Sequence, residues 1–188
     1  MGNEIKTVKI LGFAGSLRKG SFNKALLRLA SELVPEGAQL DIFDLEGIPP
    51  FNQDLEATPP EKVKEFKAKI RAADAILVAT PEYNYSVPGV LKNAIDWASR
   101  PYGDNALEGK PVALMGASIG MLGTARAQYH LRQTFVFLNM FPLNRPEVML
   151  PFVDKKVGED GRITDETAKK LVKALLQELV AWTKKLQG

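Results

Sequence analysis

Segment 12–23 of this 188-residue chain, Gly-Phe-Ala-Gly-Ser-Leu-Arg-Lys-Gly-Ser-Phe-Asn, holds a dense set of hydrogen-bond donors. It follows an apolar run at residues 8–11 and leads into a helical pattern near Phe22, which predicts a strand, a tight turn and a helix N-terminus. Such a junction attracts anions, because the first helical turn has free N–H groups and the helix dipole favours negative charge. Five side chains of this loop can donate hydrogen bonds to an anion: Ser16, Arg18, Lys19, Ser21 and Asn23.

This donor set suits a terminal phosphate, whose exposed oxygens each need a donor. The alternative is a glycine- and serine-rich turn that binds nothing, but ordinary turns gather fewer donors. The sequence therefore favours a phosphate site at residues 12–22.

A second segment with functional groups, Thr-Pro-Glu-Tyr-Asn-Tyr-Ser-Val-Pro, covers residues 80–88. Its two prolines stiffen the backbone, so that fixed N–H and C=O groups can face a planar heterocycle. Tyr83 and Tyr85 can contact such a ring, and Asn84 offers both a donor and an acceptor. A surface loop without a ligand is the alternative for this segment taken alone.

A third segment, residues 116–123, is rich in glycine and precedes a helical pattern. Its glycines predict a backbone that approaches a ligand closely, and its N–H groups are expected to face the same site. Taken alone, a glycine-rich loop is weak support for binding.

Strand and helix patterns alternate along the chain and must position these three segments. We predict strands at residues 8–11, 39–45, 75–79, 112–115 and 147–150. We predict helices at residues 22–34, 60–73, 89–99, 124–140 and 164–186. Short apolar strands between helices indicate an α/β fold, a doubly wound parallel sheet with helices on both faces. Ligands of such folds bind at the carboxyl ends of the strands, where the three segments should meet.

Length and composition predict a single domain over residues 1–188 with no membrane insertion, because every apolar run is far shorter than a bilayer requires. Residues 1–6 lack a secretory core, which favours a cytoplasmic location. The chain has no cysteine and one histidine, which argues against a metal centre and thiol chemistry. The net charge of +3 comes from scattered basic residues, so we expect no nucleic-acid partner.

Taken together, the three segments and the run Lys-Asn-Ala-Ile-Asp-Trp at residues 92–97 resemble the NADPH-dependent FMN reductase family, which includes bacterial quinone and chromate reductases. The resemblance covers nearly the whole chain and implies a flavodoxin-like five-stranded sheet of order 2-1-3-4-5. It implies that the FMN phosphate is held by Ser16, Arg18, Ser21, Phe22 and Asn23. It implies that the flavin ring is lined by Pro81, Glu82, Tyr83 and Asn84, with Ser118 and Gly120 beside the ribityl chain and ring.

The resemblance further implies an enzyme that passes two electrons from NAD(P)H through FMN to a small acceptor. Quinones, chromate, azo compounds, nitroaromatics and free flavin all suit an open flavin face. No side chain needs to act as a catalyst, because the cofactor carries the chemistry. Arg100 and Tyr85 are candidate substrate contacts, although a surface role for Arg100 is the simpler interpretation.

Three other functions remain as alternatives. An electron-carrier flavodoxin is disfavoured by the sequence pI of about 9.0, because such carriers tend to be acidic. A nicotinamide dehydrogenase would use Asp41 or Asp44 to hold the ribose, but the spacing Gly12-x-x-Gly15 departs from Gly-x-Gly-x-x-Gly. A flavin-binding sensor without turnover is the third. A P-loop is excluded because no Gly-Lys-Ser/Thr motif exists, and a phospho-receiver domain fails because Asp74 precedes its strand.

The predicted helix 124–140 is apolar on every side around residues 135–138, which indicates burial on every side. We therefore predict that it contributes to a homodimer or homotetramer interface, with Tyr129 and Arg126 as polar partners. His130 is expected at the surface or an interface. Two tryptophans on apolar helix faces are expected in the core, Trp97 and Trp182.

Overall fold

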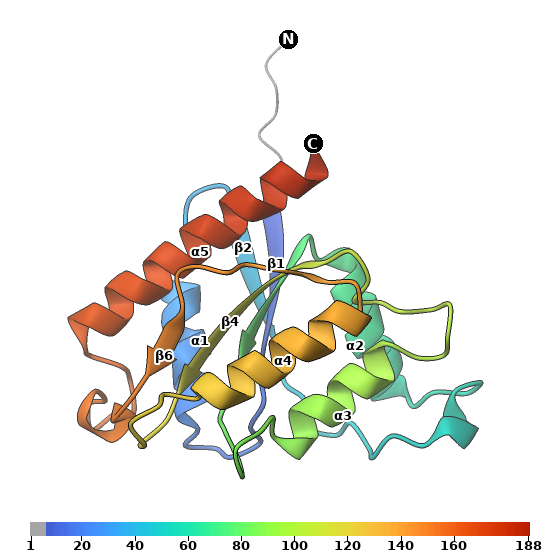
Figure 1. The fold of residues 1–188 in the computed structure, drawn as a ribbon, viewed down its shortest axis with the longest axis horizontal. Coiled ribbons are helices and arrows are strands. Elements are labelled where there is room, and N and C mark those ends of the chain that lie inside the picture. Colours follow the sequence, from blue (N-terminus) through green and yellow to red (C-terminus); the bar gives the residue numbers. More distant parts are fainter. Residues whose placement is uncertain (1–6) are drawn as a thin grey trace.

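The computed structural model describes residues 7–188 and is built around a parallel sheet (Figure 1). Four strands form its centre: β1 (Val8–Ala14), β2 (Ala38–Phe43), β3 (Ala75–Ala79) and β4 (Pro111–Ala117). The order is β2-β1-β3-β4, and the remaining position is shared by β5 (Phe141–Pro142) and β6 (Val148–Leu150), which both pair with β4. The predicted order 2-1-3-4-5 is confirmed.

Helices cover both faces of the sheet (Figure 1). One face packs against α1 (Phe22–Glu32) and α5 (Glu166–Gln187). The other packs against α2 (Glu61–Ala72), α3 (Gly89–Ala98) and α4 (Ala125–Phe137). Every side chain of β3 is buried, because this central strand contacts helices on both faces. The connections include two short 3-10 turns, η1 (Gln53–Leu55) and η2 (Val153–Lys155).

The last sheet position differs from the prediction of one strand at 147–150. Pro111 and Val112 of β4 pair with β5, whereas residues 115–117 pair with β6. The N–H groups of Phe141 and Leu143 donate to carbonyls at the start of β4, at 3.0 and 2.8 Å, so Pro142 between them needs no N–H for this ladder. The chain then leaves the sheet before it returns at Val148. Because this edge is divided into two short strands, the sequence pattern predicted only the second of them, β6.

The two tryptophans have different environments. Trp97 is 1% exposed, as predicted, and its indole N–H donates to the Pro49 carbonyl at 2.9 Å. The prediction of a core position for Trp182 is wrong, because this side chain is only half-buried and donates to the Phe141 carbonyl at 3.1 Å. It lies near the end of α5 and contacts the short edge strand β5 through this hydrogen bond.

The predicted burial of α4 on every side depends on a subunit interface and stays a prediction, because a single chain buries this helix only in part. Phe135 and Leu138 are buried, but Val136 is 81% and Phe137 76% exposed, so the helix is not covered on every side by its own chain. None of the helices in residues 7–188 has the length and apolar character required to cross a bilayer.

Candidate functional site

The three predicted loops meet at the carboxyl ends of β1, β3 and β4 and enclose a cleft of about 230 Å³, which we call the loop cleft. Eleven residues line it: Ser16, Arg18, Ser21, Phe22, Asn23, Pro81, Glu82, Tyr83, Ala117, Ser118 and Ile119. Every residue predicted to bind the cofactor is among them except Asn84 and Gly120. The structure therefore gathers residues more than 100 positions apart, because parallel strands end at one edge of the sheet.

The first loop is held close to the sheet and to α3. The Gly15 N–H donates to the Ala79 carbonyl at 2.9 Å, and a Cβ on Gly15 would lie 2.9 Å from the Pro88 ring. The Ser21 hydroxyl caps α1 by accepting the Lys24 N–H at 3.3 Å. Within residues 7–188, the backbone N–H groups of residues 16–20 donate no hydrogen bond to the protein. Glycine at position 15 is thus required by close packing, and the loop after it has unused donors.

The charge at this loop is positive. The first turn of α1 contains no acidic residue, and the Arg18 guanidinium lies 5.2 Å from the centroid of the Phe22 ring. Both of these side chains line the loop cleft. An arginine, a helix N-terminus and free N–H groups together form an anion-binding arrangement.

Asn23 has a role that the sequence did not indicate. Its side-chain amide donates to the Ala117 carbonyl and accepts the Ala117 N–H, both at 3.0 Å. Asn23 is 3% exposed, so these hydrogen bonds are shielded from water. The pair fixes the start of α1 against the end of β4, and hence the first loop against the third.

Glu82 joins the second loop to α4. Its Oε2 accepts the backbone N–H groups of Arg126 at 3.0 Å and Ala127 at 3.2 Å, and its Oε1 pairs with the Arg126 guanidinium. Thr124, the residue before the helix, has φ 75° and its side chain makes no capping hydrogen bond. A carboxylate from another segment thus satisfies the first turn of α4 and complements its dipole. The hydrogen bond that the Arg126 guanidinium donates to Glu82 raises the pKa of Arg126.

The second loop ends in a tight turn. Tyr83 and Ser86 exchange backbone hydrogen bonds of 3.1 and 3.0 Å, and the two residues between them have φ of 48° (Asn84) and 69° (Tyr85). Two successive positive φ values are typical of a type I′ turn, in which asparagine is common and tyrosine is not. Tyr85 is held there by the Arg126 guanidinium, whose Cζ lies 3.5 Å from the ring centroid. Asn84, at the exposed tip, lies outside the lining of the loop cleft.

Two of the three glycines in the third loop are needed for close packing within the protein, a role that the sequence expectation did not include. A Cβ on Gly116 would lie 1.8 Å from the Thr124 hydroxyl and 2.6 Å from the Thr80 carbonyl. Gly123 has φ 53°, and a Cβ there would lie 2.6 Å from the backbone of Met149. Only Gly120 is exposed and free of such contacts. The loop is thus fixed at both ends and open at Gly120.

Arg100 and His130 lie away from the loop cleft lining. Arg100 is half-buried, with its Cζ 4.0 Å from the Tyr102 ring centroid, in a separate hollow that Phe137 also lines. His130 is exposed, as expected, and its Nδ1 lies 2.8 Å from the Ser86 hydroxyl. Tyr129 donates to Glu147 at 3.0 Å, and this hydrogen bond raises the pKa of its phenol.

Comparison with known proteins agrees with this geometry. The family model for NADPH-dependent FMN reductases matches residues 8–155, which include all three loops. The chain belongs to this family. Membership makes it an oxidoreductase with FMN as cofactor and NAD(P)H as electron donor.

The sequences of several relatives match nearly the whole chain. An NAD(P)H-dependent FMN reductase of Pseudomonas aeruginosa is 53% identical over 182 residues, which cover 96% of this chain and 98% of that protein. A 2-hydroxy-1,4-benzoquinone reductase of Burkholderia is 41% identical and covers 94% and 97% of the two chains. The structure of FerB, an NAD(P)H:acceptor oxidoreductase of Paracoccus denitrificans, superposes with a TM-score of 0.86 at 36% identity, covering 95% and 98%.

Sequence reasoning on this FMN reductase missed two features of the loop cleft. Ala117 and Ile119 line it, and although both lie within the glycine-rich third segment, their apolar side chains gave no signal of binding. Arg126 was expected at an interface, but the structure pairs it with Glu82 beside the loop cleft. The signal for this pair is weak, since 44 residues separate the partners.

Proposed function

We propose that this FMN reductase transfers two electrons from NAD(P)H to quinones, with FMN seated in the loop cleft. The arrangement of the first loop is the observation that carries the proposal. It combines the N-terminus of α1, Arg18 and the N–H groups of residues 16–20, which donate to no acceptor within residues 7–188, at one side of the loop cleft. Relatives that include a benzoquinone reductase support quinones as the acceptor class.

In this proposal the FMN phosphate lies on the first loop. The hydroxyls of Ser16 and Ser21 and the Arg18 guanidinium donate to its oxygens, while Phe22 lines the same end of the loop cleft. These donors are numerous enough for a dianion, because backbone N–H groups add to the side chains. Asn23 acts through Ala117, with which it forms two hydrogen bonds, and keeps the first and third loops in register.

The flavin ring lies between the second and third loops, against Pro81, Glu82, Tyr83 and Asn84 and beside Ser118 and Gly120. When bound, FMN accepts a hydride from NAD(P)H and delivers two electrons to the acceptor. The protein's part is orientation and electrostatics. Within residues 7–188 the backbone N–H groups of Glu82 and Ile119 make no hydrogen bond, so they are available to stabilise negative charge beside them.

The acceptor reaches the open side of the loop cleft. Tyr85, which is 69% exposed and stacked on Arg126, is the candidate contact on that side. Arg100 lies in another hollow, so its role as a substrate contact requires a second subunit to bring it near a cleft. Chromate, azo and nitro compounds and free flavin remain further candidate acceptors.

We also propose that the protein assembles as a homodimer or homotetramer through α4. Val136 and Phe137, adjacent in the last turn of α4, are 81% and 76% exposed, and exposed apolar side chains that lie close together are typical of an interface. Arg126 and Tyr129, the polar partners predicted from the sequence, have partners within the chain. Light scattering tests this assembly, and a monomer at micromolar concentration would remove it. The proposed location is the cytoplasm, which cell fractionation tests.

The function is tested with purified protein and a quinone. We expect a yellow protein that releases FMN on heating, and NADPH oxidation that accelerates when benzoquinone is added. A colourless protein that binds NADPH but not FMN would favour the nicotinamide dehydrogenase. Bound FMN that NADPH fails to bleach in a stopped-flow experiment would favour the electron carrier or the sensor.

A further inference from the structure

An apolar surface patch borders the loop cleft on the side of the third loop. Its members are four apolar side chains whose exposed fractions lie between 44% and 72%: Ile119, Met121, Leu122 and Phe152. Ile119 also lines the loop cleft, so the patch continues from the site out to the surface. Exposed apolar side chains that lie close together mark binding surfaces, because soluble proteins otherwise scatter such residues. We call these four side chains the rim patch.

The rim patch comes from two segments that backbone hydrogen bonds hold side by side, the loop before α4 and the segment after β6 (Figure 1). The Ser118 carbonyl accepts the Val153 N–H at 3.1 Å, and the Gly120 carbonyl accepts the Phe152 N–H at 3.4 Å. Segments joined in this way lie about 5 Å apart. Phe152 therefore lies beside both chain neighbours of Gly120, which belong to the rim patch.

Phe152 has a backbone conformation that phenylalanine rarely adopts. Its φ is 50°, in the left-handed region that favours glycine and asparagine. Its ring is 44% exposed, so packing in the core does not account for a phenylalanine here. The Lys155 ammonium lies 5.7 Å from the ring centroid, but it is exposed and can keep its water. Residues held in rare backbone conformations cluster at binding sites, which makes this ring a candidate ligand contact.

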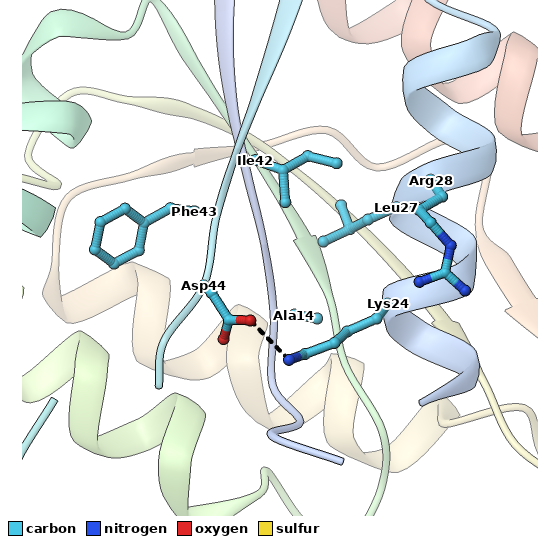
Figure 2. A pocket seen from close by; sticks show the side chains of 7 residues that line it. All are labelled: Ala14, Lys24, Leu27, Arg28, Ile42, Phe43 and Asp44. Carbon is cyan, nitrogen blue, oxygen red and sulfur yellow. Dashed lines mark hydrogen bonds and ion pairs between the residues drawn. The ribbon is translucent and has the colours of Figure 1, made fainter. Parts of the chain in front are cut away.

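The rim patch differs in charge from the apolar hollow between α1 and the end of β2. Residues 117–124 and 148–153 contain no charged residue. In the hollow, the exposed Ile42 lines the same space as Lys24 and Asp44, whose Nζ and Oδ2 atoms form an ion pair at 2.8 Å (Figure 2). A hydrocarbon placed there would remove water from two charges, which is costly. The rim patch carries no such cost and suits a ligand group without polar atoms.

The rim patch is also separate from the apolar residues proposed for the subunit interface. It precedes the first turn of α4, whereas Val136 and Phe137 lie in the last turn. At 1.5 Å per residue, the 13 residues of α4 place the two surfaces about 18 Å apart. Subunit contacts at the end of α4 therefore do not require the rim patch.

We propose that the rim patch binds the hydrocarbon tail of a quinone whose ring is reduced in the loop cleft. The proposal rests on the proposed function, because the ring must enter the cleft. Since Ile119 belongs to both surfaces, the tail leaves the cleft over this residue and extends along Met121 and Phe152. The redox step is unchanged: NAD(P)H and one proton convert the quinone to its hydroquinone, NAD(P)⁺ is released, and the tail takes no part. The substrate class is thus a lipophilic quinone with an isoprenoid tail.

The test compares two benzoquinones with identical ring substituents, one without a tail and one with a single five-carbon isoprenoid tail. The kcat/KM of the FMN-loaded protein is measured for each quinone with NADPH as donor. The tail ratio, defined as the value for the tailed quinone divided by the other, cancels effects on the ring and on the donor. Each fully buried CH₂ group improves binding by about fourfold, so partial burial of the tail should give a tail ratio of about ten.

Two substitutions make the rim patch polar without changing a residue that lines the loop cleft: Met121→Gln and Phe152→Asn. Asparagine tolerates the positive φ at position 152. In the combined variant the tail ratio should fall from about ten to about one. Leu186→Gln is the matched control, because this 39% exposed side chain lies beside Asp74 and Lys110, at the opposite edge of the sheet, and the tail ratio should persist.

Quinone binding is measured separately by calorimetry without NADPH, where the unaltered chain should bind the tailed quinone about tenfold more tightly. The inference is overturned by a tail ratio near one in the unaltered chain, by an undiminished ratio in the combined variant, or by an equal fall in Leu186→Gln. A changed molecular mass of the combined variant in light scattering would assign the rim patch to subunit contacts instead. If the unaltered chain prefers the tailed quinone in binding but reduces neither quinone, the proposed function fails and this inference stands.

Discussion

Asn23 and Ala117 form a closed pair in which one side-chain amide satisfies both backbone groups of a residue 94 positions away. The pair joins the start of α1 to the end of β4, and the two elements also share one apolar core cluster. Because the first loop follows β1 and the third follows β4, the pair also sets the width of the loop cleft.

The first prediction concerns this pair. Asn23→Ala leaves the Ala117 N–H and C=O buried without partners, which should lower the free energy of unfolding by about 2–4 kcal/mol. Denaturant unfolding of the apoprotein measures the change. Asn144→Ala is the control, because that exposed amide accepts only from Arg132 and should cost under about 0.5 kcal/mol. Equal stability of the two variants would contradict the assigned role of Asn23.

The second prediction concerns Arg18. A charged hydrogen bond contributes about 1.5–3 kcal/mol, so Arg18→Ala should weaken FMN binding by about ten- to a hundredfold. Fluorescence titration measures the affinity. Lys19→Ala removes the neighbouring charge, which does not line the loop cleft, and should change the affinity by less than about threefold. Unchanged affinity in Arg18→Ala would place the phosphate elsewhere.

The third prediction distinguishes two contributions of Glu82 to α4: its hydrogen bonds to the first turn and its negative charge. Glu82→Ala removes the acceptor of the Arg126 and Ala127 N–H groups, a loss comparable to an N-cap at about 0.5–2 kcal/mol. Hydrogen exchange in the first turn of α4 should therefore accelerate. Glu82→Gln keeps one oxygen as an acceptor and should largely preserve the protection. Similar exchange in both variants and the unaltered chain would show that the turn does not need Glu82.

The fourth prediction concerns Gly116. A methyl group there would lie 2.6 Å from the Thr80 carbonyl, so Gly116→Ala should cost about 1–3 kcal/mol through forced backbone shifts. Thermal unfolding measures the loss. Gly120→Ala is the matched control for stability, since its Cβ would meet only the Ser118 hydroxyl at 3.5 Å. A normal melting temperature for Gly116→Ala would mean that the third loop yields more easily than its packing indicates.

The fifth prediction concerns acid stability. The Lys67 ammonium, which is almost fully buried, donates to Asp104 at 2.6 Å and lowers the pKa of that carboxyl. The folded pKa lies below the unfolded value of about 3.9, so the stabilisation is complete above that value and is lost as the pH falls through the folded pKa. The stability difference between the unaltered chain and Asp104→Asn should therefore shrink below about pH 4. A difference that grows in acid would contradict this sign.

The outline of the fold was predictable because it depends on local patterns. Apolar runs such as the one at β3 and helical patterns such as α5 show in the sequence, and short connections leave few topologies. The division of the edge strand was not predictable, because two residues, Phe141 and Pro142, are too few to show a strand pattern in the sequence. Trp182 was misplaced because an apolar helix position does not say whether a neighbour covers it.

The loop cleft was predictable only where its residues form a local sequence motif. Ser16, Arg18 and Ser21 lie within six residues, so their chemistry is visible as a motif. The contacts of Glu82 with Arg126 and of Asn23 with Ala117 join distant segments and depend on how elements pack. Long-range polar pairs of this kind leave no periodic signal, so sequence reasoning assigned both side chains to the ligand.

Because Glu82 caps α4, the first turn of this helix contacts the second loop, while its last turn lies at the proposed subunit interface. Its first turn is held by the loop proposed to carry the flavin ring, and its last turns expose Val136 and Phe137. A neighbour that restrains this helix and a cofactor that restrains this loop therefore act on one rigid body. Thermodynamic linkage makes the effect reciprocal. The factor by which bound cofactor strengthens self-association equals the factor by which self-association strengthens cofactor binding.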